Sequence, residues 1–119
     1  MKARIFKSAV LHFSVSQDSD GSIAWQGTYK GVPVKAVVPI GDDCIIMLDP
    51  DASKERVFRN LLRVGQDGHT RWSAELPASP DVFLDVHSEA GCLAAHTWSG
   101  FKLRLDPASG QPLEKEFVK

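Results

Sequence analysis

Residues 34–48 read VKAVVPIGDDCIIML, and this stretch decides how the rest of the chain is interpreted. Two apolar runs of strand length flank Gly41-Asp42, a pair of residues that favours a tight turn. Both runs are rich in valine and isoleucine, whose branched side chains fit the pleated surface of a sheet. The stretch therefore predicts a β-hairpin.

Two more strands extend this hairpin into a unit of four. They are expected at 60–64 and 70–76, on either side of a turn at Asp67-Gly68. A second unit follows the same plan, with strands expected at 82–87, 92–98, 101–105 and 113–118. No window carries the apolar stripe of a helix, so we expect no helix longer than about two turns. The prediction is an all-β fold, an antiparallel meander of roughly eight to ten strands.

The turn residues recur at similar intervals along the chain. Cys44 and Cys92 stand at matching points 48 residues apart, while Gly68 and Gly110 stand 42 apart. The first unit therefore holds six extra residues, which we place in its 49–58 loop. Repeats of four short strands with a period of about 40 to 50 residues are typical of propeller blades.

The N-terminal segment fits half of such a unit, because Trp25 stands 47 residues before Trp72. We therefore divide a single domain, residues 1–119, into a half unit at 1–30, unit one at 31–80 and unit two at 81–119. Propellers close with four to eight blades, so two and a half units are too few to close one.

The glycine and tryptophan spacing resembles the tryptophan-docking repeats of pyrroloquinoline-quinone-type (PQQ-like) β-propellers. In those repeats an Asp-rich turn and a glycine precede a docking tryptophan by four positions. Gly21 to Trp25 and Gly68 to Trp72 match this spacing, and 106–110 matches the turn, although Glu114 replaces the third tryptophan. The resemblance implies blade-like units. The quinone-binding residues of the enzymes have no counterparts here, so it implies no cofactor.

Composition narrows the class of protein. Fourteen Lys and Arg stand against fifteen Asp and Glu, giving a net charge of −1 with both signs mixed along the chain. This pattern lacks the basic footprint of a nucleic-acid-binding protein. No apolar run is long enough for a membrane span or a signal peptide, and two cysteines make no disulfide framework. We expect a cytoplasmic protein that binds neither nucleic acid nor membrane.

One group of reactive side chains lies in unit two. If a two-residue turn at Ala90-Gly91 closes its first hairpin, Asp85 faces His96, His87 faces Ala94, and Cys92 shares their sheet face. A carboxylate, two imidazoles and a thiol could bind zinc or form a nucleophile with its base. The alternative is a polar face turned to solvent. The spacing matches no known zinc motif, and we predict no stoichiometric metal.

The tryptophans and one loop complete the candidates for binding. Trp25 and Trp72 are expected to pack between sheets, with Trp72 largely buried, because they recur at equivalent positions. Trp98 ends the strand expected at 92–98, beside Ser99-Gly100, and is expected to be exposed, as a binding residue would be. The Lys54-Glu55-Arg56 tip of the inserted loop is either a solvated loop or a binding loop.

Three functions are compatible with these features. The first is a non-catalytic binding or protein-interaction module, because the familiar catalytic and nucleotide motifs are absent. The second is a small enzyme or metal protein that uses Asp85, His87, Cys92 and His96. The third is a structural subunit of a larger β assembly. A homodimer is expected, because a second copy would cover the open sheet edges. The alternative is a monomer in which residues 1–11 fold back over an edge of their own sheet.

Overall fold

The computed structural model describes residues 5–8, 13–17, 23–65 and 67–118. Within these ranges no helix is long and apolar enough to span a membrane. One 3-10 helix, η1 (Pro50–Ala52), accompanies strands β1 (Ile5–Ser8), β2 (Phe13–Gln17), β3 (Ile23–Tyr29), β4 (Val32–Ile40), β5 (Asp43–Leu48), β6 (Val57–Phe58), β7 (Leu61–Val64), β8 (Thr70–Ser73), β9 (Asp81–Glu89), β10 (Cys92–Thr97), β11 (Phe101–Leu105) and β12 (Pro112–Phe117).

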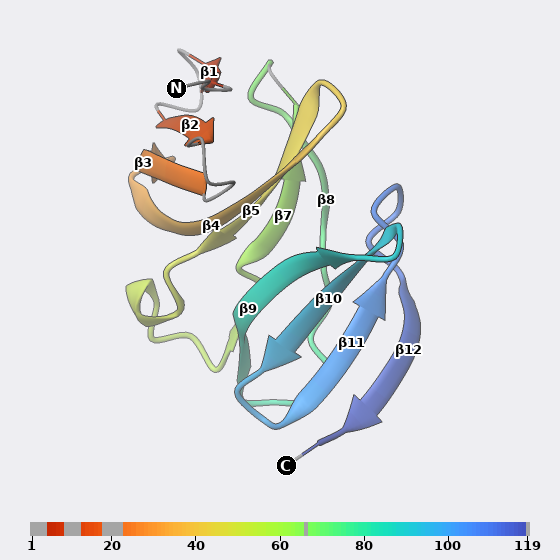
Figure 1. The fold of residues 1–119 in the computed structure, drawn as a ribbon. Coiled ribbons are helices and arrows are strands. Elements are labelled where there is room, and N and C mark those ends of the chain that lie inside the picture. The colour runs from red at the N-terminus through yellow and green to blue at the C-terminus, as the bar shows by residue number, and fades with distance from the viewer. Residues whose placement is uncertain (1–4, 9–12, 18–22, 66, 119) are drawn as a thin grey trace.

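The strands form two sheets, as Figure 1 shows. The first has the order β1-β2-β3-β4-β5-β7-β8, and the second has the order β12-β11-β10-β9-β6. The all-β, mainly antiparallel fold is confirmed, and so are all eight strands of the two predicted units. Unit one is β4, β5, β7 and β8, and unit two is β9 to β12. The N-terminal part contributes three strands that continue into β4, rather than the half unit of two that the repeat predicts.

The first sheet is strongly curled. Tyr29, at the end of β3, donates its hydroxyl hydrogen to the Gly68 carbonyl oxygen at 3.3 Å, and its hydroxyl lies 2.9 Å from that of Thr70. These contacts join β3 to the turn before β8, although three strands separate β3 from β8 in the sheet. The curl brings β3 over unit one (Figure 1).

Unit one is buried on both faces. One face belongs to a core made of Tyr29, Val34, Val37, Cys44, Ile46, Leu48, Leu62 and Val64. The other face packs on unit two in a second core made of Ile45, Met47, Leu61, Ala74, Phe83, Val86, Leu93, Ala95, Leu103 and Leu105. The strand β5 sends alternate side chains into each core, which explains its uninterrupted apolar sequence.

The structure corrects how the two units correspond. The two-residue turns Gly41-Asp42 and Ala90-Gly91 close equivalent hairpins, which sets the offset between the units at 49 residues rather than 48. Cys44 therefore corresponds to Leu93, and not to Cys92. Cys44 is buried in the first core and Leu93 in the second. Each therefore lies on the face of its sheet that packs against earlier strands of the chain. The prediction was wrong because it aligned two identical residue types instead of two turns.

The inserted loop of unit one crosses to unit two. It forms η1 and then β6, which pairs with β9 in parallel, with Val57 opposite Asp81 and Phe58 opposite Val82. This is the only parallel pairing among the described strands. We call 49–58 the strap, because it belongs to unit one in sequence and completes the sheet of unit two.

Asn60 fixes the two units where the strap ends. Its side-chain nitrogen donates to the carbonyl oxygens of Leu48 and Phe83, both at 2.9 Å, and its side-chain oxygen accepts from the Phe83 backbone nitrogen at 2.9 Å. Asn60 itself is fully buried. A buried amide whose groups are all satisfied in this way holds β5 and β9 in one fixed arrangement.

Trp72 lies at the outer edge of the contact between the units. It is partly buried, not largely buried as expected, because it stands on the edge strand β8. Its indole nitrogen donates to the Pro107 carbonyl oxygen at 2.9 Å, and its ring lies flush against Gly110. The predicted role of Trp25 cannot be compared, since its side chain lies outside the described residues.

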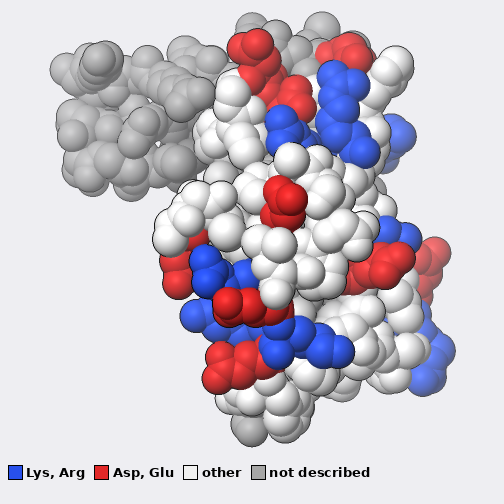
Figure 2. Space-filling model, turned by 90° about the vertical axis from the view of Figure 1, so that its right-hand side faces the viewer, with Lys and Arg blue, Asp and Glu red and all other residues white. Residues whose placement is uncertain are grey.

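Charges on the surface are mixed. On the face drawn in Figure 2, acidic and basic side chains lie in small groups of both signs. A charged side chain also joins the two units, because Arg63 donates to the Asp43 carboxylate in unit one and to the Pro107 carbonyl oxygen in unit two, both at 2.9 Å. No broad area of a single sign forms on that face.

Candidate functional site

The predicted pairing of the reactive residues is confirmed. Asp85 lies opposite His96 across β9 and β10, and His87 lies opposite Ala94. The Asp85 carboxylate binds the His96 ring nitrogen Nδ1 at 2.8 Å and also accepts from the His96 backbone nitrogen at 3.2 Å. These two residues therefore form a tight acid–imidazole pair at the surface.

The other reactive residues have separate partners. The ring nitrogen Nε2 of His87 lies 3.1 Å from a carboxylate oxygen of Glu89, and this hydrogen bond holds the pKa of Glu89 below its usual range. The Cys92 sulfur accepts a hydrogen bond from Arg104 at 3.7 Å. In the part of the chain that the structure describes, no three His, Cys, Asp or Glu side chains are grouped so that they could hold a metal ion.

These polar residues lie on the face of unit two that is turned away from unit one, and this position explains why the face is polar. At the 49-residue offset, the equivalents in unit one are Ala36 for Asp85, Val38 for His87 and Met47 for His96. Those residues pack against unit two, in or beside the second core. Within the described residues no sheet covers the same face of unit two, so polar side chains there meet solvent at no desolvation cost.

A pocket of about 360 Å³ lies beside this face, between the two units. Its wall is apolar and comes from β4, β5, the strap and β9. The residues of the wall are Ala36, Met47, Pro50, Leu84 and Val86. Leu84 keeps 45% of its surface exposed, which is high for a leucine that belongs to a strand. The volume is at the lower end of the range for small-molecule sites.

Two equivalent β-bulges shape the pocket. Between Val34 and Ala36 the pairing of β4 with β5 shifts by one residue, which leaves Lys35 unpaired. Between Phe83 and Asp85 the pairing of β9 with β10 shifts in the same way and leaves Leu84 unpaired. Lys35 and Leu84 are equivalent at the 49-residue offset, and both line the pocket. Bulges re-aim side chains in this manner beside binding sites.

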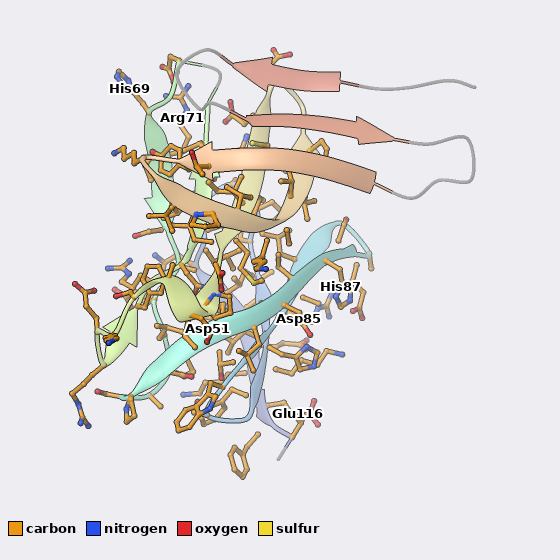
Figure 3. The ribbon with its side chains drawn as sticks, turned by 90° about the vertical axis from the view of Figure 1, so that its left-hand side faces the viewer. Asp51, His69, Arg71, Asp85, His87 and Glu116 are labelled. Atoms are coloured by element: carbon orange, nitrogen blue, oxygen red, sulfur yellow. The ribbon has the colours of Figure 1, made fainter. Side chains whose placement is uncertain are left out.

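The rim of the pocket carries three carboxylates and one amine. Asp49 lies 4.0 Å from the Lys35 amine and accepts a hydrogen bond from the Asp51 backbone nitrogen at 2.9 Å. The Asp51 carboxylate forms no ion pair with any residue that the structure describes. Figure 3 shows Asp51 and Asp85 on the same side of the molecule, beside β9. The rim is therefore net negative.

Sequence reasoning located one residue of this pocket, Asp85, together with its partner His96. His87, Cys92 and Trp98 do not line it. Trp98 is 56% exposed, as predicted, and its backbone nitrogen donates to the Val82 carbonyl oxygen at 2.9 Å.

The strap contains the loop tip that the sequence left open between a solvated loop and a binding loop. Asp49, Pro50 and Asp51 at its start line the pocket, whereas the expected tip at 54–56 does not. The bulges that aim Lys35 and Leu84 have no signal in a single sequence, and the pocket forms only when the units dock.

Comparisons with known proteins identify a family and a fold. A family model described as "Domain of unknown function (DUF7957)" matches residues 31–117. Among curated proteins no match was found. Among solved structures, the chain is similar to the crystal structure of the computationally designed Ika8 protein, with a TM-score of 0.57 and 13% identity. The similarity covers 97% of this chain and 36% of that chain, so the chain spans about a third of the designed protein, and the likeness shows the fold alone.

Proposed function

The chain belongs to the DUF7957 family of domains of unknown function, and from its geometry we propose that it is a non-catalytic binding module whose ligand enters the pocket between its two units. The observation that carries the proposal is the apolar wall beneath a charged rim, where the two units meet. Concave apolar sites with a few placed polar groups are the usual form of ligand pockets.

The enzyme alternative has less support. The Asp85 and His96 pair has the geometry of a general base, but the lining of the pocket contains no serine, threonine or cysteine that such a base could activate. The polar face around the pair is also explained without catalysis, because unit one does not cover this face of unit two. Binding requires nothing beyond the groups that line the pocket.

Three further properties are proposals of the same kind. Blade-like docking of the PQQ type is supported by the contacts of Trp72 with Pro107 and Gly110 in the next unit. A cytoplasmic location is supported by two unpaired cysteines, Cys44 and Cys92. A homodimer stays a prediction, and light scattering tests it: a mass near that of one 13.0 kDa chain at micromolar concentration contradicts it.

A titration with small amphiphiles tests the binding function. Hexylammonium, hexanol and hexanoate share one apolar chain and differ in the head group. Their binding is followed through the backbone amide resonances of the protein in solution. We expect at least one of them to shift amides at 35–36, 47–51 and 84–86.

Two leucine variants make this test specific. Leu84→Ser removes apolar wall and is expected to weaken binding severalfold. Leu113→Ser is the matched control, because Leu113 is an exposed leucine on β12 that does not line the pocket. Equal effects of the two variants, or the absence of binding by all three amphiphiles, contradict the proposed function.

A further inference from the structure

The pocket has a charge preference that follows from its rim. Asp49, Asp51 and Asp85 contribute three negative charges, and Lys35 contributes one positive charge. A cation that enters therefore gains from the field of the rim, whereas an anion is repelled. The apolar wall accepts the apolar chain of a cationic or an anionic ligand equally well, so the charge of the head group decides which ligand binds more tightly.

The partners of the rim carboxylates indicate where a cation would bind. Asp85 is engaged by His96 at 2.8 Å and Asp49 faces Lys35 at 4.0 Å, while the Asp51 carboxylate has no ion pair among the described residues. Asp51 stands next to Pro50, which belongs to the apolar wall. A ligand with a cationic head and an apolar body can therefore contact both at once.

Resting on the proposed function, we propose that the ligand of this pocket is an alkylammonium: a primary amine on an unbranched apolar stem, either as a free amine or as a lysine side chain. The stem lies along Leu84 and Met47, and the ammonium group binds Asp51. The volume of about 360 Å³ is sufficient for one such group.

The Lys35 amine competes with the ammonium group of the ligand for the negative charge of the rim. Its side chain is 56% exposed and its amine lies at the long limit of an ion pair with Asp49, so it is weakly held. Its charge offsets part of the field that would attract the ligand. Replacing it with methionine keeps an apolar side chain of similar length and removes the charge.

The three amphiphiles introduced above test the charge preference directly. At low salt we expect hexylammonium to bind more tightly than hexanol, and hexanol more tightly than hexanoate. Added salt is expected to reduce the differences in affinity among the three amphiphiles, since exposed charges are screened. Hexanol or hexanoate binding as tightly as hexylammonium overturns the alkylammonium proposal and leaves the binding function standing, whereas no binding by any of the three overturns both.

Charge variants locate the ammonium group. Asp51→Asn is expected to weaken hexylammonium binding about two- to fivefold and Lys35→Met to strengthen it by a similar factor, as for exposed charge pairs. Asp42→Asn, in the turn between β4 and β5, removes the same charge outside the pocket and is the control. An effect of Asp42→Asn equal to that of Asp51→Asn contradicts the proposed contact.

A final comparison separates the two sources of the amine. Nα-acetyl-lysine N-methylamide presents the ammonium group on a stem that is attached to a peptide backbone. If it shifts the same amide resonances as hexylammonium, a lysine side chain is an admissible ligand. If only hexylammonium does so, the pocket accepts free amines alone.

Discussion

The contact between Trp72 and Gly110 joins residues that lie far apart in the sequence. A Cβ atom built on Gly110 would lie 2.6 Å from two indole carbons of Trp72, and the φ angle there is +74°. Glycine is thus required both for space and for backbone conformation. The tryptophan spacing predicted docking, but the residues on which Trp72 docks, Pro107 and Gly110, lie 35 and 38 residues later and are identified only by the structure.

Gly110→Ala is expected to destabilise the protein by about 2–4 kcal/mol, the sum of the left-handed backbone cost and the overlap with the indole. In a Trp72→Ala background the overlap disappears, so the same substitution should cost about 1–3 kcal/mol less. Chemical denaturation of the four proteins of this cycle measures the difference. Additive effects contradict the close approach.

The Cys44 thiol is fully buried beside Asp43, and burial followed by the negative charge of Asp43 raises its pKa from 9.0 to about 12. Above the ordinary pKa the unfolded chain releases this proton and the folded chain keeps it. The unfolded state then binds fewer protons, so the free energy of unfolding falls as pH rises from about 9 towards 12.

We expect this fall to be on the order of 1 kcal/mol per pH unit in urea unfolding between about pH 9 and about pH 11. Cys44→Ala is expected to remove most of the slope, and Cys92→Ala, which removes the other thiol of the chain, is the control variant. If the free energy of unfolding of Cys44→Ala falls with pH as steeply as that of the parent protein, the loss of stability at alkaline pH comes from groups other than Cys44.

At the scale of strands, the sequence was most informative where each strand is bounded by a turn and packed on a core. Seven of the eight strands of the two units satisfy both conditions, whereas β12 is bounded by a turn but is exposed along its whole length. The strand β6 satisfies neither: it has two residues, no turn residue ends it, and its partner β9 runs parallel to it. Parallel pairing between distant segments leaves no periodic signal in a single sequence, so the crossing of the strap could not be predicted.

The joint beside the strap depends on one buried amide. Asn60→Ala leaves two carbonyl oxygens and one backbone nitrogen without partners in the interior, and each buried unsatisfied group costs about 1–3 kcal/mol. We expect a total loss of about 3 kcal/mol or more in urea unfolding. Ser109→Ala, which removes an exposed bond to the Gln111 backbone, is the control and should change stability by less than about 0.5 kcal/mol.

At the scale of the whole molecule, the two units differ in what covers them. The polar residues of unit two were identified from sequence and correctly paired, but their meaning depended on the order of the layers. Asp85, His87 and His96 occupy positions that are apolar in unit one, since unit two covers unit one there. The sequence alone does not show which sheet face is covered by another sheet, so it cannot distinguish a reactive site from a polar face that is simply exposed to solvent.

We therefore expect the polar face to limit association. Asp85→Ala, His87→Val and His96→Met together give unit two the apolar residues of unit one and should produce species larger than the parent protein, because a broad apolar sheet face is exposed. Light scattering coupled to size exclusion measures this. The control Asp85→Asn, His87→Gln and His96→Gln keeps the face polar. A triple apolar variant with the mass of the parent contradicts the role of the face.

The strap also bears on how such a protein can be inherited. Because β6 is encoded within unit one but completes the sheet of unit two, the boundary between the repeats in sequence is not a boundary between them in space. A duplication or exchange of genetic material that ended at residue 80 would separate a sheet from its edge strand and from Asn60. The smallest block that recombination can transfer intact is thus the pair of repeats, and a single repeat is not a module.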